Sequence, residues 1–97
     1  MYRLEEIARV LAATDNEVLI EKFLTAILTK KEIDEISSRW ELVKLLHQGL
    51  SQRKISEKLG LSLCKITRGS RELKKRASAF KAMVEIHMHN LQDRRTI

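Results

Sequence analysis

Positively charged side chains recur at helical spacing between residues 65 and 75 of this sequence. Lys65, Arg68 and Arg71 are each three positions apart, and Lys74 and Lys75 continue the row. Residues three or four positions apart share one face of an α-helix, so this segment would present its cations on one side. Lysine and arginine side chains neutralise the phosphates of nucleic acids. The spacing therefore favours a helix that binds a polyanion.

The residues before and within this row are typical of two short helices joined by a tight turn. Ser51 can cap a first helix that ends at Gly60, because glycine adopts a positive φ angle at little cost. Ser62 can cap a second helix, and Ser56 is small where the two helices must approach. The apolar residues that would pack between them are Ile55, Leu59, Leu61 and Ile66. We therefore predict a helix-turn-helix over residues 51–75.

A helix-turn-helix binds DNA by placing its second helix in the major groove. Here the outward face of that helix is polar and cationic, and the first helix offers further side chains to phosphates. The residues that we expect at the DNA are Gln52, Arg53, Leu63, Cys64, Lys65, Thr67, Ser70, Arg71 and Lys74. The alternative is a helical hairpin whose basic face is merely solvated. The combination of turn glycine, apolar residues and charge favours DNA binding.

The composition of the chain favours an all-α fold. Its 97 residues include no proline and three glycines, which argues against a turn-rich β protein. Thr14 with Glu17, and Thr29 with Glu32, have the spacing of capping boxes at the starts of two helices. The five or six expected helices span about 2–13, 15–27, 30–47, 51–60, 63–75 and 78–91, and we expect residues 92–97 to fray.

Charge and hydropathy limit the class of protein. The formal net charge of +6 favours a nucleic acid or an anionic membrane as partner. No apolar run is long enough for a transmembrane helix or a signal peptide, so we expect no membrane partner. The single cysteine, Cys64, excludes an intrachain disulfide and is consistent with the cytoplasm, where we expect the protein to act.

The sequence has no constellation of residues for catalysis or metal binding. His87 and His89 are two positions apart, so they diverge on a helix and cannot form a zinc site with Cys64. Paired carboxylates, a nucleophile elbow and a phosphate-binding glycine loop are also missing. We therefore expect neither an enzyme nor a metalloprotein.

Apolar faces are extensive for a chain of this size. On the third expected helix, the apolar residues at helical spacing are Ile33, Ile36, Trp40, Val43, Leu46 and Leu50. The last helix carries Phe80, Met83, Val84, His87 and Leu91. A small monomer buries a limited share of its surface, so such faces favour association. We expect one domain over residues 1–97 that forms a homodimer, with residues 1–48 and 78–91 in the dimer core.

Part of the sequence resembles the tryptophan repressor family. Ile-Thr-Arg-Gly-Ser at residues 66–70, followed by Glu-Leu-Lys at 72–74, is similar to the DNA-reading helix of that family. Leu-Ser-Gln-Arg at residues 50–53 is similar to the segment that opens its reading head, and the resemblance covers about residues 23–75. It implies an intertwined all-α homodimer that represses tryptophan biosynthesis or uptake genes. The implied corepressor is L-tryptophan, and the implied target is a double-stranded DNA operator.

The same resemblance implies where the ligand binds. Arg68 would pair with the ligand carboxylate and Arg39 would lie across the indole ring, two contacts that suit a guanidinium group. Thr29 would donate a hydrogen bond to the carboxylate, and Gly69 would leave room for the ring. The remaining implied contacts, to the ammonium group, are backbone carbonyls near Ala26 and Leu28 of the other subunit.

Two positions depart from the family pattern. Glu72 stands where the family usually has a serine near the ligand ammonium, so it would either pair with this group or crowd it. Lys65 replaces a small hydroxyl residue at the groove edge, which would alter operator preference. Two alternatives therefore stay open. One is a related DNA-binding regulator with another effector or none, and the other is a helical adaptor whose basic face meets an acidic partner or a membrane.

Overall fold

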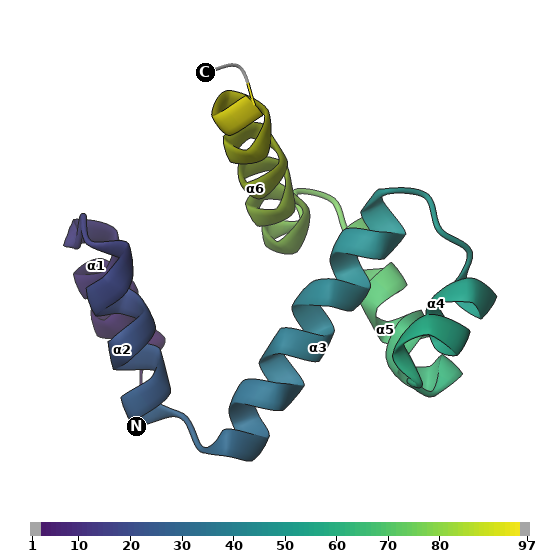
Figure 1. The fold of residues 1–97 in the computed structure, drawn as a ribbon, viewed down its shortest axis with the longest axis horizontal. Coiled ribbons are helices and arrows are strands. Elements are labelled where there is room, and N and C mark those ends of the chain that lie inside the picture. The colour runs from purple at the N-terminus through teal and green to yellow at the C-terminus, as the bar shows by residue number, and fades with distance from the viewer. Residues whose placement is uncertain (1–2, 96–97) are drawn as a thin grey trace. The chain divides into compact units, whose positions relative to one another are not determined.

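The protein is all-helical in the part that the structure describes. The computed structural model describes the backbone of residues 3–95 and the side chains of residues 3–91. The helices are α1 (Leu4–Ala13), α2 (Glu17–Ile27), α3 (Lys30–His47), α4 (Gln52–Leu59), α5 (Leu63–Lys74) and α6 (Ala79–Arg95) (Figure 1). Residues 3–95 contain no strand, so the predicted all-α class is confirmed.

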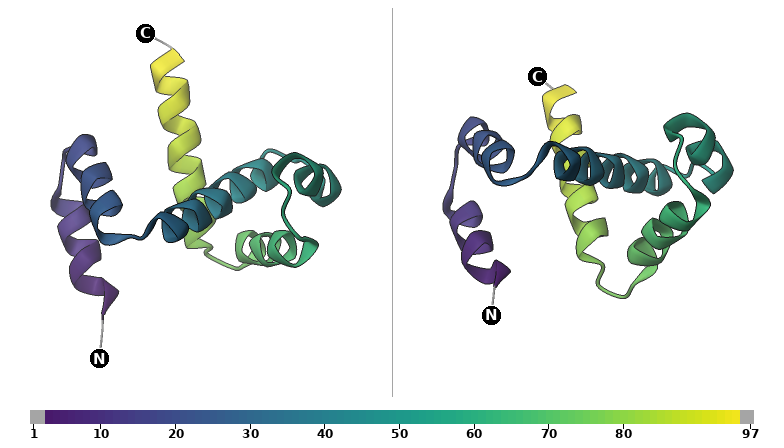
Figure 2. Two further views of the ribbon diagram at one scale, coloured as in Figure 1. Left: turned by 60° about the horizontal axis from the view of Figure 1, so that its bottom comes forward. Right: turned by 90° about the horizontal axis from the view of Figure 1, so that it is seen from below.

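The chain divides into two compact units, residues 1–35 and residues 36–97. In the first unit, α1 and α2 run antiparallel and side by side (Figures 1 and 2). In the second unit, most of α3 is joined by α4, α5 and α6. The predicted helix-turn-helix therefore belongs wholly to the second unit. The predicted division into a reading head and a dimer core concerns two chains and stays a prediction.

The start of α2 differs from the sequence prediction. Asn16 caps this helix, because its side-chain oxygen accepts a hydrogen bond from the amide of Leu19 at 3.0 Å. The hydroxyl of Thr14 instead donates to the carbonyl of Val10 at 2.6 Å, within the end of α1. The predicted capping box of Thr14 with Glu17 is therefore wrong. Asn16 stands directly before the first helical residue, where an amide oxygen reaches the orphan donors.

The start of α3 confirms the second predicted capping box. The amide of Thr29 donates to Oε1 of Glu32 at 2.8 Å, and the amide of Glu32 donates to Oγ1 of Thr29 at 3.1 Å. The backbone hydrogen bond from Thr29 lowers the pKa of Glu32, and the bond to the Thr29 side chain lowers it further. Both side chains are thereby held at the first turn of α3.

Helix α3 buries a wider face than the sequence pattern indicated. Leu42 and Leu45 are buried in a cluster with Ile55 of α4 and Ile66 of α5. By contrast, Ile36 of the predicted face is 49% exposed. The apolar pattern identified one face of α3, but this helix packs against the α4–α5 pair as well as against α6. The predicted core of α3 was therefore incomplete.

Helix α6 contacts α3 through aromatic side chains. Phe80 stacks on Trp40 with ring centroids 5.9 Å apart, and His87 meets Trp40 edge-on at 5.8 Å. Val84, on the same side of α6, is fully buried. Met83 is 58% exposed, so the predicted apolar face of the last helix is only partly covered by this chain.

Helix α6 is also longer than predicted. It begins after Ser78, whose hydroxyl accepts a hydrogen bond from the amide of Lys81 at 3.1 Å. We expected the helix to end near Leu91, with a frayed segment after it. The backbone of residues 92–95 is helical instead, since no glycine or proline interrupts it there. Residues 96–97 lie outside the described part of the chain.

Candidate nucleic-acid interface and ligand site

Helices α4 and α5 are separate and are joined by a short turn, as predicted. Ser51 and Ser62 each accept a hydrogen bond from the backbone amide three residues later, at 3.2 and 3.4 Å. Gly60 ends α4 with φ 67° and ψ 26°, which is the left-handed conformation that glycine adopts without steric cost. The predicted caps and the predicted turn residue are therefore confirmed.

A shared core and one further hydrogen bond hold the two helices together. Ile55 and Ile66 are completely buried, and Leu59 and Leu61 pack against the same cluster. The hydroxyl of Ser56 donates to the carbonyl of Leu61 at 2.9 Å, across the turn. The sequence indicated Ser56 only as a small residue. Its hydrogen bond also fixes how the chain leaves α4, so α4 and α5 pack as one pair.

The start of α5 exposes the residues predicted to enter the major groove. Leu63 is 59% exposed, and Cys64 and Lys65 are exposed beside it. An exposed leucine at this position offers an apolar contact to a thymine methyl group, and a lysine offers a contact to guanine or phosphate. Thr67 and Ser70 are half-buried further along the helix. The surface thus combines apolar, polar and cationic groups.

Most cations of this surface have no partner in the described part of the chain. The exposed cations of α5 without a hydrogen bond or ion pair to a side chain of residues 3–91 are Lys65, Arg68, Arg71 and Lys74. On α4, Arg53 forms an exposed ion pair with Glu57 at 3.6 Å, while Gln52 is half-buried. Exposed pairs of this kind contribute little free energy. Arg53 can therefore exchange its partner for a phosphate.

Gly69 lies where α5 approaches α3. It is buried, and a Cβ atom at this position would lie 3.2 Å from Cδ2 of Leu42 and 3.5 Å from Cδ1 of Leu46. The missing side chain therefore permits close packing of the two helices, whatever its role toward a ligand. The sequence analysis did not identify Leu42 or Leu46 as part of the site. The available signal was a glycine inside a helix, which costs about 1 kcal/mol relative to alanine and points to a packing reason.

The two arginines predicted at the ligand stand on the two helices that meet at Gly69. Arg39 precedes Leu42 by about one turn of α3, and Arg68 directly precedes Gly69 on α5. Both guanidinium-bearing residues are exposed. A planar, charged ligand at this contact would find one arginine on each helix.

Glu72 is engaged by a lysine rather than by Arg68. Nζ of Lys75 lies 2.9 Å from Oε1 of Glu72, and the two side chains are 63% and 41% exposed. Arg68 stands one turn before Glu72 on α5, yet no ion pair joins the two among the described residues. Arg68 is thus left available for another anion. Since the exposed Lys75 pair is weak, Glu72 can also change partner.

Thr29 and Leu28 belong to the first unit. The hydroxyl of Thr29 accepts a hydrogen bond from the amide of Glu32 at 3.1 Å, and the hydrogen bond between the Thr29 side chain and the Glu32 carboxylate lowers the pKa of Glu32. Leu28 ends α2 in an extended conformation, with its amide bonded to the carbonyl of Leu24 at 3.0 Å. The predicted contact with a ligand carboxylate would therefore require the Thr29 hydroxyl to turn away from Glu32.

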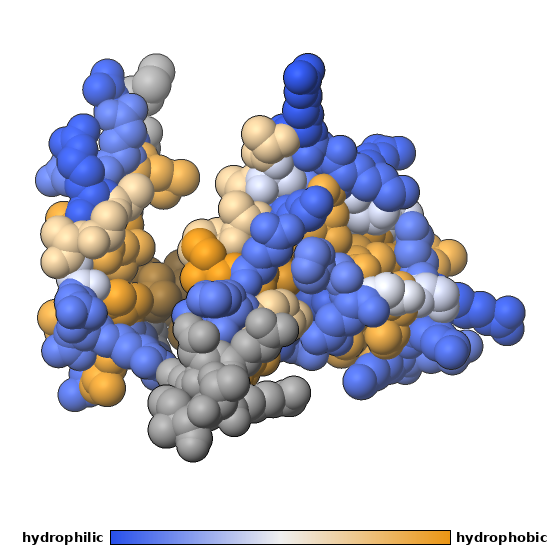
Figure 3. Space-filling view, turned by 90° about the horizontal axis from the view of Figure 1, so that it is seen from above, coloured by the Kyte–Doolittle hydropathy of each residue, from blue (hydrophilic) through white to orange (hydrophobic). Residues whose placement is uncertain are grey.

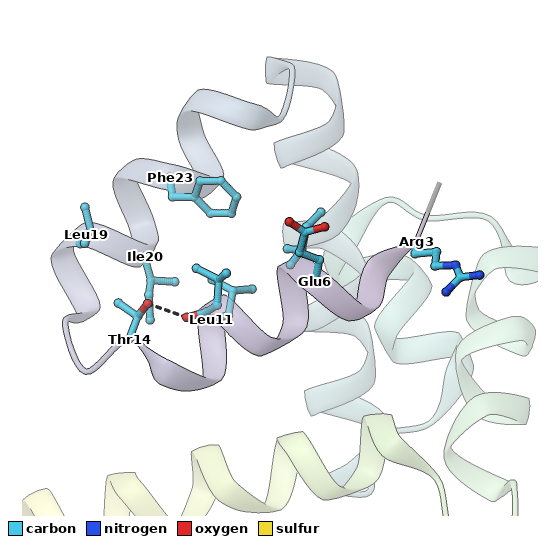
Figure 4. Close-up of a pocket in the computed structure, with 9 residues that line it drawn as sticks. Arg3, Glu6, Leu11, Thr14, Leu19, Ile20 and Phe23 are labelled. Atoms are coloured by element: carbon cyan, nitrogen blue, oxygen red, sulfur yellow. Dashed lines mark hydrogen bonds between the residues drawn. The ribbon is translucent and has the colours of Figure 1, made fainter. Parts of the chain in front are cut away.

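The first unit also carries a large apolar surface. A hollow of about 760 Å³ lies between α1 and α2, and Leu11, Ile20 and Phe23 line it together with Ile7 and Val10 (Figure 4). No described residue of α1 or α2 is buried. Figure 3 shows the resulting hydrophobic surface in orange. Apolar surface of this extent marks a site of association.

The described residues contain no cluster of three histidine, cysteine, aspartate or glutamate side chains that could hold a metal ion. Within the same residues, no helix has the length and apolar character needed to cross a membrane.

Comparison with known proteins assigns these helices to a family. Residues 3–88 match the family model described as Trp repressor protein. The chain belongs to the Trp repressor family. The match includes α1 and the first part of α6, which lie outside the stretch that we found similar by its motifs. None of the solved structures matches the chain.

Several Trp repressor relatives share about two thirds of the chain. A Trp operon repressor homolog of Vibrio cholerae is 46% identical over 63 residues, which are 64% of this chain and 61% of that protein. A homolog of Xylella fastidiosa is 36% identical over 70 residues, or 71% of this chain and 76% of that protein. One of Chlamydia trachomatis is 34% identical over 70 residues, with shares of 71% and 74%. The match thus spans less than two thirds of the Vibrio protein.

Proposed function

We propose that this member of the Trp repressor family is a sequence-specific, DNA-binding transcriptional repressor with L-tryptophan as corepressor. One observation carries the proposal: the α4–α5 pair presents an exposed leucine and unpaired cations on its outer surface. A helix-turn-helix places this surface in the major groove. The relatives named Trp operon repressor homolog support genes of tryptophan metabolism as the target. These relatives are bacterial, which supports the cytoplasm as the place of action.

The proposed DNA contacts fall into two groups. Leu63, Cys64 and Lys65 begin α5, so they would read base edges, with Thr67 and Ser70 contributing polar contacts. The residues proposed to contact phosphates are Gln52, Arg53, Arg71 and Lys74. Phosphate contacts provide affinity that falls with salt, whereas the base contacts provide specificity.

We further propose that the repressor is a homodimer. Its support is the apolar surface of α1 and α2, where Leu4, Val10, Val18 and Leu19 are 54–79% exposed in the single chain. On α6, Met83 and Ile86 are also more than half exposed. A second copy of the chain would cover these faces. Two reading heads would then enter successive major grooves about 34 Å apart.

The proposed corepressor site uses the contact between α3 and α5. Arg68 would bind the carboxylate of L-tryptophan, Arg39 would lie on the indole ring, and Gly69 would admit the ring. The hydroxyl of Thr29 would turn from Glu32 and donate to the carboxylate, and the carbonyl of Leu28 would accept from the ammonium. Glu72 would leave Lys75 and join the ammonium.

In this proposal the ligand acts by favouring one position of the reading head. A ligand held by arginines of both α3 and α5 binds best when the two helices have the spacing that suits it. The bound form then has α5 positioned for DNA, and the ligand shifts the population by its difference in affinity for the two positions. Repression is thereby coupled to the ligand concentration.

The test is DNA binding with and without L-tryptophan, after selection of the operator from random duplex sequences. We expect L-tryptophan to tighten binding to the selected operator. We also expect Arg71→Ala with Lys74→Ala to weaken binding to all sequences and to reduce its dependence on salt, by about 0.9 in logarithmic slope per phosphate contact. A wild-type protein that binds no DNA in either condition would overturn the proposal.

A repressor with another effector is the second candidate, and Glu72 is the observation that favours it. Its carboxylate adds a charge near the proposed ligand site. Titration calorimetry with L-tryptophan separates the two candidates. Absence of binding heat, with operator affinity unchanged by L-tryptophan, would remove the corepressor and leave the DNA-binding role intact.

A further inference from the structure

The cationic surface of α5 continues beyond the helix-turn-helix. Helix α5 ends at Lys74, Lys75 and Arg76 follow directly, and Lys81 lies in the first turn of α6. All four residues are exposed. No acidic residue occurs in the first turn of α6. We call these four residues the junction cluster. Arg76 and Lys81 were not among the residues predicted at the DNA.

Three members of the junction cluster line a shallow hollow, and the fourth, Arg76, stands between two of its lining residues in the sequence. Ala77 adopts a φ angle of 55°, in the left-handed region that residues other than glycine seldom occupy. This turn reverses the chain between α5 and α6. A hollow of about 550 Å³ results, and Lys74, Lys75, Ser78 and Lys81 are among its lining residues. The reversal therefore brings cations of two helices around one concave surface.

The cations of the junction cluster are available to an external anion. Lys75 pairs with Glu72 at 2.9 Å and Lys81 pairs with Glu85 at 4.0 Å, but the two lysine side chains are 63% and 53% exposed. The other two members of the cluster have no side-chain partner within residues 3–91. Because exposed ion pairs contribute about 0–1 kcal/mol, a phosphate can displace them at small cost.

The surroundings of the cluster favour a nucleic-acid backbone over an acidic protein. Protein interfaces need an apolar centre. Between residues 64 and 82, however, no large hydrophobic side chain is exposed. The cluster also continues directly from Lys74, which the proposed function places on a phosphate. Leu73, Ala77 and Ala82 contribute apolar area to the hollow, but its exposed charged side chains are mainly lysines, which suit the sugar–phosphate backbone.

We propose that Arg76 and Lys81 form a second phosphate-binding surface, which contacts the DNA backbone outside the bases read by α5. This inference rests on the proposed DNA-binding function and extends its footprint. The added contacts depend on phosphate charge alone, so they strengthen binding to every sequence. They also lengthen the duplex that the repressor protects.

The test compares two charge-neutralised proteins of equal net charge. The first carries Arg76→Gln and Lys81→Gln. The control carries Arg9→Gln and Lys22→Gln on α1 and α2. Arg9 forms an exposed ion pair with Glu5 at 3.7 Å, as Lys81 does with Glu85, and Lys22, like Arg76, has no side-chain partner in the described residues. Helicity and thermal unfolding of both variants verify that they fold.

Dissociation constants are measured by fluorescence anisotropy over a series of salt concentrations, on the selected operator and on a scrambled duplex. We expect the Arg76 and Lys81 variant to bind both duplexes about tenfold or more weakly at low salt. Its logarithmic salt slope should fall by about 0.9 per lost contact. The control should stay close to wild type. Charge reversal by Arg76→Glu alone should weaken binding more than Arg76→Gln.

Each result either supports or overturns the second phosphate-binding surface. If the Arg76 and Lys81 variant matches the control in affinity and slope, this inference is overturned while the DNA-binding proposal stands. If the wild-type protein binds no duplex with or without L-tryptophan, the proposed function fails first and the inference falls with it. Removing the base pairs that flank the two half-sites on their outer sides should weaken operator binding by the wild type. The same shortening should leave operator binding by the Arg76 and Lys81 variant unchanged.

Discussion

At the scale of single residues, Gly69 joins the packing of α3 and α5 to the ligand binding that we propose. Alanine in place of this glycine would favour the α5 helix by about 1 kcal/mol. The glycine is nevertheless required for close packing, since a Cβ atom would lie 3.2 Å from Cδ2 of Leu42. Leu42 is itself 3% exposed and packed against Ile55 and Ile66, so it has little room to retreat. Glycine at this position therefore lowers the stability of the α5 helix but allows a short distance between α3 and α5.

We predict that Gly69→Ala weakens L-tryptophan binding by at least tenfold, with a change in unfolding free energy of less than about 1 kcal/mol. The helix gains stability from alanine. This gain offsets the repulsion from Leu42, which is relieved by moving α5 away from α3. Titration calorimetry and urea denaturation measure the two quantities. Adding Leu42→Val, which removes one carbon from the contact, should restore part of the affinity; an unaltered affinity in Gly69→Ala would contradict the prediction.

At the scale of helices, the features set by neighbouring residues were predictable from sequence. The caps at Ser51 and Ser62, the turn at Gly60 and the Thr29–Glu32 box all depend on residues within four positions of one another. The start of α2 was missed because Asn16 and Thr14 compete for the same cap, and the sequence does not show which one reaches the amide.

The features that depend on distant residues were not predictable in the same way. The buried face of α3 is wider than predicted because Leu42 and Leu45 also contact α4 and α5, and a periodic pattern does not indicate which helices will pack against it. The concave arrangement of Lys74 and Lys81 depends on the turn at Ala77. The family resemblance supplied the ligand contacts of Arg39 and Arg68, which stay predictions.

The conformation of Gly60 gives a prediction for the turn between α4 and α5. With φ at 67°, alanine at this position would bear the steric cost of the left-handed region, about 1–2 kcal/mol. We expect Gly60→Ala to lower the unfolding free energy by about this amount. Gly60→Asn should lose less, because asparagine visits this region more readily. Urea denaturation compares the two variants, and equal losses would argue against backbone strain as the cause.

The capping box of α3 gives a prediction for pH. Since the hydrogen bonds from Thr29 lower the pKa of Glu32 in the folded protein, they stabilise the fold above the unfolded pKa of glutamate, about 4.3. This stabilisation is lost as the pH falls through the lower folded pKa. Glu32→Gln keeps an acceptor oxygen but does not titrate. We therefore expect the melting temperature of wild type, relative to Glu32→Gln, to be constant between pH 7 and 5 and to decrease below about pH 4.

Thermal unfolding followed by circular dichroism between pH 3 and 7 measures this difference. The other carboxylates are the same in both proteins, so their titration cancels in the comparison. A difference that stays constant down to pH 3 would show that the Glu32 charge contributes nothing to the cap.

At the scale of the whole molecule, the described buried residues lie in the second unit and none lies in α1 or α2. The second unit has a buried cluster of Leu42, Leu45, Ile55 and Ile66, so the reading head has a core within one chain. Helices α1 and α2 bury no residue, although they carry Phe23, Leu24 and Ile27 among other apolar side chains. Burial of such side chains stabilises by about 1.5–3 kcal/mol each. This exposure supports the proposed homodimer, in which a second copy would cover these side chains.

If that partner is a second copy, a charge on the apolar face of α2 will separate the subunits. Ile27 is 53% exposed in the single chain, and Ile27→Lys would place an unpaired ammonium in both halves of a dimer interface. About half of each isoleucine remains to be buried in the dimer, so losing both costs about 1.5–3 kcal/mol, and we expect the dimer dissociation constant to rise at least tenfold. Glu21→Lys, which places a lysine on the exposed polar side of α2, is the control and should leave the dimer intact.

Sedimentation equilibrium measures the association, and fluorescence of Trp40, which packs against Phe80, reports whether the second unit stays folded. Operator affinity should fall together with dimerisation, because one reading head contacts one half-site only. A wild-type protein that sediments as a monomer while binding its operator would exclude the homodimer. The apolar face of α2 would then need a different partner.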